Sequence, residues 1–188
     1  MSLTLTRGAL AALLPLLIAQ HYFNYAIAAT LVFAMNLVSS IIQPLFGFLS
    51  DRFHTGWIII PALLITGLGF GTLGWDNQYF LLITSCLVCG VGIAAYHPDA
   101  AKLVNGLVDV NQGHAMSVFS FGGNLGFACG PITVTLVANA LGISRVGLFI
   151  LVGGGVALLL AHYFPAMRRQ SAQHWQQKRQ RESDSPVP

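Results

Sequence analysis

Three side chains near the middle of the chain are of the kinds that bind metals or transfer protons. His97 and Asp99 lie two residues apart, and His114 follows further along. Imidazole and carboxylate groups are ordinary zinc ligands. However, the chain has no H-E-x-x-H or comparable spacing, and no motif of a membrane-embedded enzyme accompanies these residues. We therefore expect no metal site, no cofactor and no catalytic residue, and we interpret the three as interfacial polar residues beside a loop.

The cysteines offer a second possible chemistry, because Cys86 and Cys89 form a C-x-x-C motif. This motif indicates thioredoxin-like redox chemistry when it follows a strand in a soluble βαβ unit. Here all three cysteines, including Cys129, lie inside apolar runs. We expect them to be small apolar residues within helices.

A stripe of polar residues between positions 114 and 137 indicates binding rather than catalysis. At about 100° per residue of helix, the polar side chains fall within an arc of about 120°; they are His114, Ser117, Ser120 and Asn124. The opposite side carries Gly122, Gly126 and Gly130, followed by Pro131. Small residues at this spacing let two membrane helices approach closely. The simpler alternative for each Ser or Asn is a hydrogen bond to a neighbouring helix.

Two further segments repeat this pattern. In residues 24–49 one face holds Asn36, Ser39, Ser40 and Gln43. In residues 79–96 the polar face is thinner, with Tyr96 and then His97 at its end. Several polar stripes in a charge-poor bundle predict a shared hydrophilic cavity. We expect this cavity to be lined by Asn36, Ser40, Gln43, Tyr96, His97, Ser117, Ser120 and Asn124.

The distribution of charge along the chain indicates which class of protein carries these polar stripes. The 188 residues include nine basic and six acidic side chains, 8% of the chain, whereas soluble proteins have about 25%. A bilayer-spanning helix needs about 20 apolar residues, and five charge-free runs are longer than that: 8–50, 53–75, 77–98, 110–144 and 146–167. This excludes a soluble globular protein. Five of the nine basic residues lie after the last run, so we also expect no nucleic-acid partner.

The sequence therefore predicts an all-α, polytopic membrane protein, a bundle of six transmembrane helices. The first charge-free run is divided by a polar stretch at residues 20–25, so it supplies two spans. The expected spans are 3–19, 24–49, 57–74, 79–96, 114–137 and 146–164. The helix containing His97 is expected to kink or end before Pro98. Residues 1–164 would form the bundle, and residues 165–188 a basic, flexible cytoplasmic tail.

Orientation follows from the positive-inside rule. With six spans, eight of the nine basic residues share one side and Arg145 alone lies opposite, so both termini should be cytoplasmic. The first span is short and contains Arg7, and we expect it to be retained rather than cleaved as a signal peptide. We expect Arg7 to reach toward the cytoplasmic face. The alternatives are that it lines a wet cavity, or that the helix begins upstream of Met1.

Two motifs resemble those of the major facilitator superfamily. Gly47-Phe48-Leu49-Ser50-Asp51-Arg52 resembles its G-x-L-x-D-R loop between helices two and three. Gly126-Phe127-Ala128-Cys129-Gly130-Pro131 resembles its fifth-helix G-x-x-x-G-P antiporter motif. Residues 90–99 and 113–124 are similar to fosmidomycin-resistance-type efflux transporters, and the resemblance covers essentially the whole chain.

The resemblance implies half of a twelve-helix major facilitator fold, with a gate motif at Gly47, Asp51 and Arg52. Asp51 would accept hydrogen bonds from the N-terminal amides of a neighbouring helix and pair with a nearby cation. Two departures matter. The Asn-Asp pair that the family carries in its first helix has no counterpart in residues 1–7, and Ser120 stands where the family more often has Gln. The missing acid puts proton coupling in question. His97 and His114 are then the remaining candidate proton carriers.

The leading hypothesis is a half-length drug efflux transporter of a bacterial cytoplasmic membrane. It would move a small molecule by rocking against a second bundle, either a separate six-helix half or a second copy of the chain. The alternative from another class is a non-transporting protein, either a remnant of a truncated gene or a membrane assembly partner. A membrane enzyme is the third possibility. The sequence identifies neither the substrate nor the coupling ion.

Overall fold

Within the residues that the structure describes, the protein is a bundle of six α-helices. The computed structural model describes residues 2–21, 24–53, 58–75, 78–108 and 111–184. Its elements, in order, are α1 (Ser2–His21), α2 (Tyr25–Phe53), α3 (Ile59–Thr72), α4 (Tyr79–Gly106), α5 (Gln112–Leu141), the short 3₁₀ helix η2 (Ile143–Leu148) and α6 (Phe149–Asp184). The predicted all-α bundle of six helices is confirmed.

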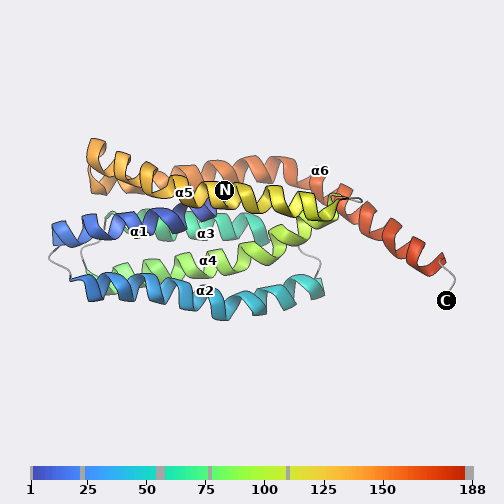
Figure 1. Cartoon of the computed structure of the whole chain (residues 1–188), viewed down its shortest axis with the longest axis horizontal. Helices are drawn as coiled ribbons and strands as arrows, with labels where there is room; N and C mark the ends of the chain where they lie inside the picture. Colours follow the sequence, from blue (N-terminus) through green and yellow to red (C-terminus); the bar gives the residue numbers. More distant parts are fainter. Residues whose placement is uncertain (1, 22–23, 54–57, 76–77, 109–110, 185–188) are drawn as a thin grey trace.

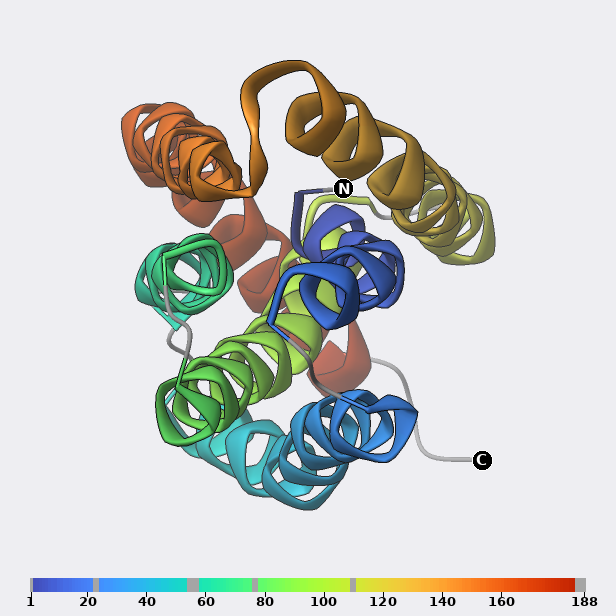
Figure 2. The same ribbon diagram turned by 90° about the vertical axis from the view of Figure 1, so that its left-hand side faces the viewer.

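The helices lie roughly parallel or antiparallel along one long axis (Figure 1). Viewed from one end, α1 lies between α5 and α2, and α4 crosses behind it (Figure 2). The most extensive contacts join α1 to α5, α2 to α4, and α3 to both α4 and α6. α1 starts about halfway along the bundle and covers only part of its length (Figure 1). We call the end where α2 and α4 finish the Asp51 end of the bundle.

Four helices are long and apolar enough to cross a membrane: Tyr25–Arg52, Tyr79–Gly106, Gln112–Leu141 and Ile143–Met167. The other two apolar helices, Leu3–Ala19 and Ile59–Thr72, are shorter. Large apolar side chains point outward on the long helices; Phe80, Leu151 and Leu158 are at least 70% exposed. Such outward apolar surface suits lipid and would be a liability in water.

Glycines set how closely the helices pack. A Cβ atom built on Gly130 of α5 would lie 2.6 Å from the backbone nitrogen of Ala9 in α1. A Cβ on Gly90 of α4 would lie 2.6 Å from the carbonyl oxygen of Met35 in α2. Because lipid tails are as apolar as leucine, membrane helices associate through such close backbone contact and not through a hydrophobic effect between helices. Cys89 belongs to the same packing: it is buried, and its Sγ donates to the carbonyl oxygen of Thr66, 3.4 Å away.

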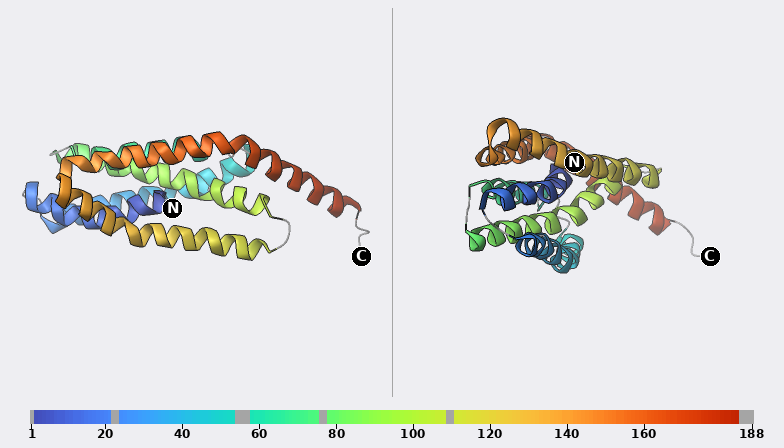
Figure 3. Two further views of the ribbon diagram at one scale, coloured as in Figure 1. Left: turned by 90° about the horizontal axis from the view of Figure 1, so that it is seen from above. Right: turned by 60° about the vertical axis from the view of Figure 1, so that its left-hand side comes forward.

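Two helices continue past prolines at which the sequence suggested a boundary. α4 runs through Pro98 to Gly106, where the sequence suggested a kink or an end. α6 runs through Pro165 to Asp184, so the described part of the expected flexible tail is helical and extends beyond the bundle (Figure 3). A proline removes one helical hydrogen bond, but long membrane helices tolerate this loss. The segment after Pro165 is rich in Gln and Arg, which favour helix. The division of the chain into a transmembrane bundle and a cytoplasmic tail stays a prediction.

Candidate functional site

Arg7 and Asn36 form a polar contact in the middle of the bundle. The Arg7 Nε donates to Asn36 Oδ1 over 3.2 Å, and a second nitrogen of the same guanidinium donates to the same oxygen. Asn36 Nδ2 in turn donates to the carbonyl oxygen of Val32, 2.9 Å away, which fixes the amide orientation. Asn36 is near the middle of α2 (Tyr25–Phe53), so Arg7 meets that helix about halfway along it. Arg7 thus bonds sideways to the adjacent helix, and its reach toward the cytoplasmic face stays a prediction.

The fourth helix adds two residues to this region. Tyr96 and His97 are both half-buried, and their rings meet edge to face with centroids 5.8 Å apart. The Arg7 charge acts on the His97 imidazole, so the two residues lie within electrostatic reach of each other. We call Arg7, Asn36, Tyr96 and His97 the polar centre; its residues come from α1, α2 and α4.

The polar stripes of α2 and α5 lie on open surface on either side of this centre. Four of the expected cavity residues are exposed and have no hydrogen bond to any residue that the structure describes: Ser40, Gln43, Ser120 and Asn124. Ser117 is also exposed, and its one hydrogen bond within the described residues is to the carbonyl oxygen of Gly113 in its own helix, 2.8 Å away. The alternative that these side chains bond neighbouring helices therefore has no support within the described residues. They are polar surface without a partner in this bundle.

The glycine side of α5 faces α1, but not over its whole length. Gly126 and Gly130 are buried, and Gly130 touches the α1 backbone. Gly122 is different, because a Cβ there would meet nothing within 4 Å. Pro131 is half-buried inside the helix next to Gly130. The structure thus brings two of the three predicted packing glycines to buried positions.

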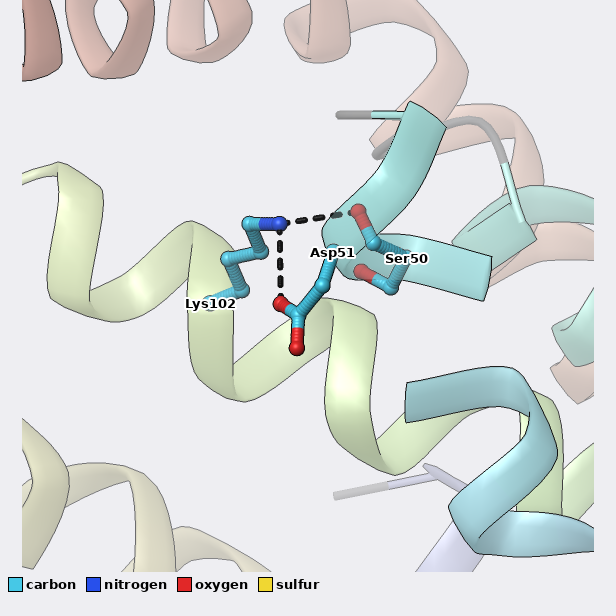
Figure 4. Close-up of polar contacts among 3 residues, drawn as sticks. All are labelled: Ser50, Asp51 and Lys102. Carbon is cyan, nitrogen blue, oxygen red and sulfur yellow. Dashed lines mark hydrogen bonds and ion pairs between the residues drawn. The ribbon is translucent and has the colours of Figure 1, made fainter. Parts of the chain in front are cut away.

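The gate motif lies at the Asp51 end, where it contacts α4. Lys102 Nζ lies 3.2 Å from Asp51 Oδ1 and donates to the carbonyl oxygen of Ser50 over 2.8 Å (Figure 4). The sequence predicted a cation beside Asp51 without identifying it, and the structure supplies Lys102. Within the described residues Asp51 accepts no hydrogen bond from a helix N-terminal amide. Arg52 is exposed, and a Cβ on Gly47 would lie 3.9 Å from the Cβ of Pro98.

A cavity of about 360 Å³ adjoins this ion pair. Its lining combines charged, amide and hydroxyl groups from α2, α4 and α5: Gly47, Ser50, Asp51, Pro98, Lys102, Asn105 and Gln112. Sequence reasoning missed Lys102, Ser50 and the burial of Asp99, because it placed residues 97–113 in a loop. A usable signal was present, since Asp99 and Lys102 are spaced to share one face of a helix. No three His, Cys, Asp or Glu residues gather in the part of the chain that the structure describes, and the expectation of no metal site stays a prediction.

Comparison with known proteins gives this arrangement its context. Residues 1–187 match the family model of the Major Facilitator Superfamily. The "Fosmidomycin resistance protein" of Escherichia coli (strain K12) is 24% identical over 163 residues, 87% of this chain and 39% of that protein. The "Uncharacterized MFS-type transporter YfnC" of Bacillus subtilis (strain 168) is 25% identical over 70% of this chain and 32% of its own length. The "Probable nitrate transporter NarT" of Staphylococcus aureus (strain N315) is 25% identical over 73% of this chain and 36% of its own.

The matched region therefore spans two fifths or less of the length of these relatives. The similarity to the fosmidomycin resistance protein agrees with the resemblance drawn from residues 90–99 and 113–124. The polar centre, the unpartnered stripes beside it and the Asp51–Lys102 contact occur in a chain whose family match runs from residue 1 to residue 187. The chain belongs to the Major Facilitator Superfamily of membrane transporters.

Proposed function

We propose that this bundle is one half of a drug efflux transporter and works by alternating access with a second six-helix bundle. The observation that carries the proposal is the exposed polar surface on α2 and α5 around the Arg7–Asn36 contact. Polar side chains facing lipid are unfavourable, whereas a second bundle over this surface would enclose them in a midplane cavity. That bundle is a separate six-helix half or a second copy of this chain. The surrounding bilayer would be a bacterial cytoplasmic membrane, with both termini on the cytoplasmic side.

The charge of the cavity favours an anionic substrate. Arg7 bonds only the neutral amide of Asn36, and no carboxylate neutralises it among the described residues. A guanidinium retains its charge in proteins and presents a planar fork of donors that matches carboxylate and phosphate groups. Two relatives are named for fosmidomycin and for nitrate. Fosmidomycin carries a phosphonate, so both names are consistent with an anion.

The alternative is a non-transporting assembly partner or a remnant. The same unpartnered polar surface would then be an interface for another membrane protein. Efflux separates the two hypotheses, since an assembly partner would reach the membrane, fold and move nothing.

The test is drug accumulation in cells that lack other efflux pumps. The chain would be expressed alone and together with a six-helix C-terminal half, with and without an uncoupler. Fosmidomycin serves as the anionic probe and ethidium as the cationic one. We expect reduced fosmidomycin accumulation only on co-expression. Uncoupler-sensitive efflux by the chain alone would show that the second bundle is another copy of this chain and not a separate half. No efflux from folded, membrane-inserted protein in either case would reject transport.

A matched pair of variants tests the polar centre. Arg7→Gln removes the charge beside Asn36, and Arg145→Gln removes an exposed charge from η2 near the opposite end of the bundle. We expect Arg7→Gln to abolish most fosmidomycin efflux and Arg145→Gln to leave it unchanged. Equal efflux in both variants would remove Arg7 from the substrate site.

A further inference from the structure

Asp99 of α4 has an environment that the gate motif does not explain. Its side chain is 1% exposed, and neither carboxylate oxygen has a hydrogen-bond partner among the residues that the structure describes. The Ser50 hydroxyl of α2 is also buried and has no hydrogen-bond partner within the described part of the chain. The polar groups that act on Asp99 are the Ser50 hydroxyl, the Ile58 amide at the start of α3 and the Lys102 ammonium, but none of them completes a hydrogen bond to it.

An ionised carboxylate is poorly accommodated in this position. Burying a charge without hydrogen bonds costs several kcal/mol even after local relaxation. A neutral carboxylic acid avoids most of that cost and can donate a hydrogen bond to a nearby oxygen such as the Ser50 hydroxyl. The conformation described here therefore suits Asp99 with a proton bound.

Lys102 connects Asp99 to the gate. It lies one helical turn beyond Asp99 on α4, and its ammonium joins α4 to α2 through the Ser50 carbonyl and Asp51. Asp51 is 81% exposed, so its carboxylate is hydrated and its contact with Lys102 breaks at little cost. The lysine stem is flexible and its ammonium is a point charge that can turn to a new partner.

From this geometry we propose that Asp99 is a proton-binding residue of the bundle and that Lys102 couples its protonation to the α2–α4 contact. When the carboxylic acid releases its proton to water, the new carboxylate attracts Lys102, which leaves Asp51 and frees the end of α2. When Asp99 takes up a proton, Lys102 returns to Asp51. Asp99 does not itself line the cavity, so its proton would reach water past Ser50, Pro98 or Lys102, which do line it. This supplies an acid for proton coupling, which the first helix lacks.

Within the described residues, α2, α4 and α5 place further charged or titratable side chains around Asp99. α2 contributes the exposed Asp51 and Arg52, and α4 contributes His97 together with Lys102. α3 contributes the Ile58 amide, and His114 of α5 is exposed. Lys102 is the charged side chain that acts on Asp99. His54 lies outside the described residues.

The use of this proton in transport rests on the proposed function, but its binding can be measured without transport. Infrared spectra distinguish a neutral carboxylic acid from a carboxylate, and the chain has only six Asp and Glu residues. In a detergent without carbonyl groups at pH 7, the folded protein should show a neutral carboxyl band. The band should disappear in Asp99→Asn and persist in Asp51→Asn. A spectrum without that band, or one unchanged in Asp99→Asn, overturns the proposal.

The role of Lys102 is tested without altering Asp99, so the test stands even if Asp99→Asn does not fold. Lys102→Gln removes the cation that would receive the carboxylate, and Arg52→Gln removes an exposed cation nearby. The midpoint at which the carboxyl band is lost as pH rises should increase by about one pH unit or more in Lys102→Gln. It should not move in Arg52→Gln. Equal midpoints in the two variants would disprove the coupling. Absence of drug efflux would bear on the proposed function and leave these spectra unaffected.

Discussion

The contact between α1 and α5 gives a prediction that one methyl group can test. Gly130→Ala adds a Cβ atom that would lie 2.6 Å from the Ala9 nitrogen and 3.0 Å from the Gly8 carbonyl carbon. Both neighbours are backbone atoms, which cannot rotate away as a side chain does. Gly122→Ala adds the same methyl to the same helix, where nothing lies within 4 Å. The two variants therefore differ only in what the methyl meets.

The expected magnitudes follow from two opposing effects. Alanine is favoured over glycine inside a helix by about 0.5–1 kcal/mol, and Gly122→Ala should gain this stability. At Gly130 the helices must separate by roughly 1 Å to restore ordinary contact, and such overpacking costs about 1–3 kcal/mol. The many short backbone contacts place Gly130→Ala near the upper end. We expect it to be destabilised by about 2 kcal/mol, which leaves the two variants about 3 kcal/mol apart.

The assay is unfolding of the purified protein in mixed detergent with increasing SDS, followed by circular dichroism. A double-mutant cycle sharpens it, because a Cβ on Gly8 would collide with the backbone carbonyl of Phe127 across the same interface. Once one methyl has separated the helices, the second adds less, so Gly8→Ala with Gly130→Ala should be less destabilised than the two losses added together. Equal stability of Gly130→Ala and Gly122→Ala would refute the close-packing argument.

Three further predictions concern the rest of the bundle. Gly126→Leu should reduce the yield of folded protein far more than Ser120→Leu, because Gly126 is buried and Ser120 is exposed; comparable yields would contradict the two-faced helix. Trp75→Phe should lose about 1 kcal/mol of stability in the same SDS assay, since Trp75 Nε1 donates to the Ser144 carbonyl over 2.8 Å; an unchanged SDS midpoint would show that this bond contributes nothing. Reporter fusions should place the basic loops in the cytoplasm and the others outside, and a cytoplasmic signal at Gly142 would overturn the six-span orientation. The cytoplasmic positions are Arg52, Lys102 and Arg168, and the outside positions are Asn77 and Gly142.

The number and order of helices could be predicted because both depend on local composition. A charge-free run of more than 20 residues has few alternatives to a membrane helix, since its backbone groups must be satisfied internally. Helix ends were less predictable. Pro98 and Pro165 look like boundaries in sequence, yet both lie inside helices. The loss of one backbone hydrogen bond is a local effect, and a long helix with good helix formers on both sides of the proline continues through it.

The polar contacts of the site were beyond sequence reasoning because they depend on the register between helices. Arg7 and Asn36 are 29 residues apart, and Asp51 and Lys102 are 51 apart. Helical periodicity shows which face a residue occupies but not the height at which two helices meet. Arg7 could therefore be placed in the first helix, but its partner could not be identified. The burial of Asp99 depends in addition on α4 continuing beyond Pro98.

The positions of two prolines connect the polar centre with the Asp51 end. Pro44 lies on α2 between Asn36 and Asp51, and Pro98 lies on α4 between His97 and Lys102. Each removes one i to i−4 hydrogen bond, so the segment beyond it can bend while the rest of the helix stays in place. In the middle of the bundle the backbones of α2 and α4 approach closely at Gly90, where a Cβ atom would lie 2.6 Å from the Met35 carbonyl oxygen. Beyond the prolines the Lys102 bonds to Ser50 and Asp51 hold the two ends together. Release of those bonds would therefore open the Asp51 end without disturbing the packing that positions Arg7 and Asn36.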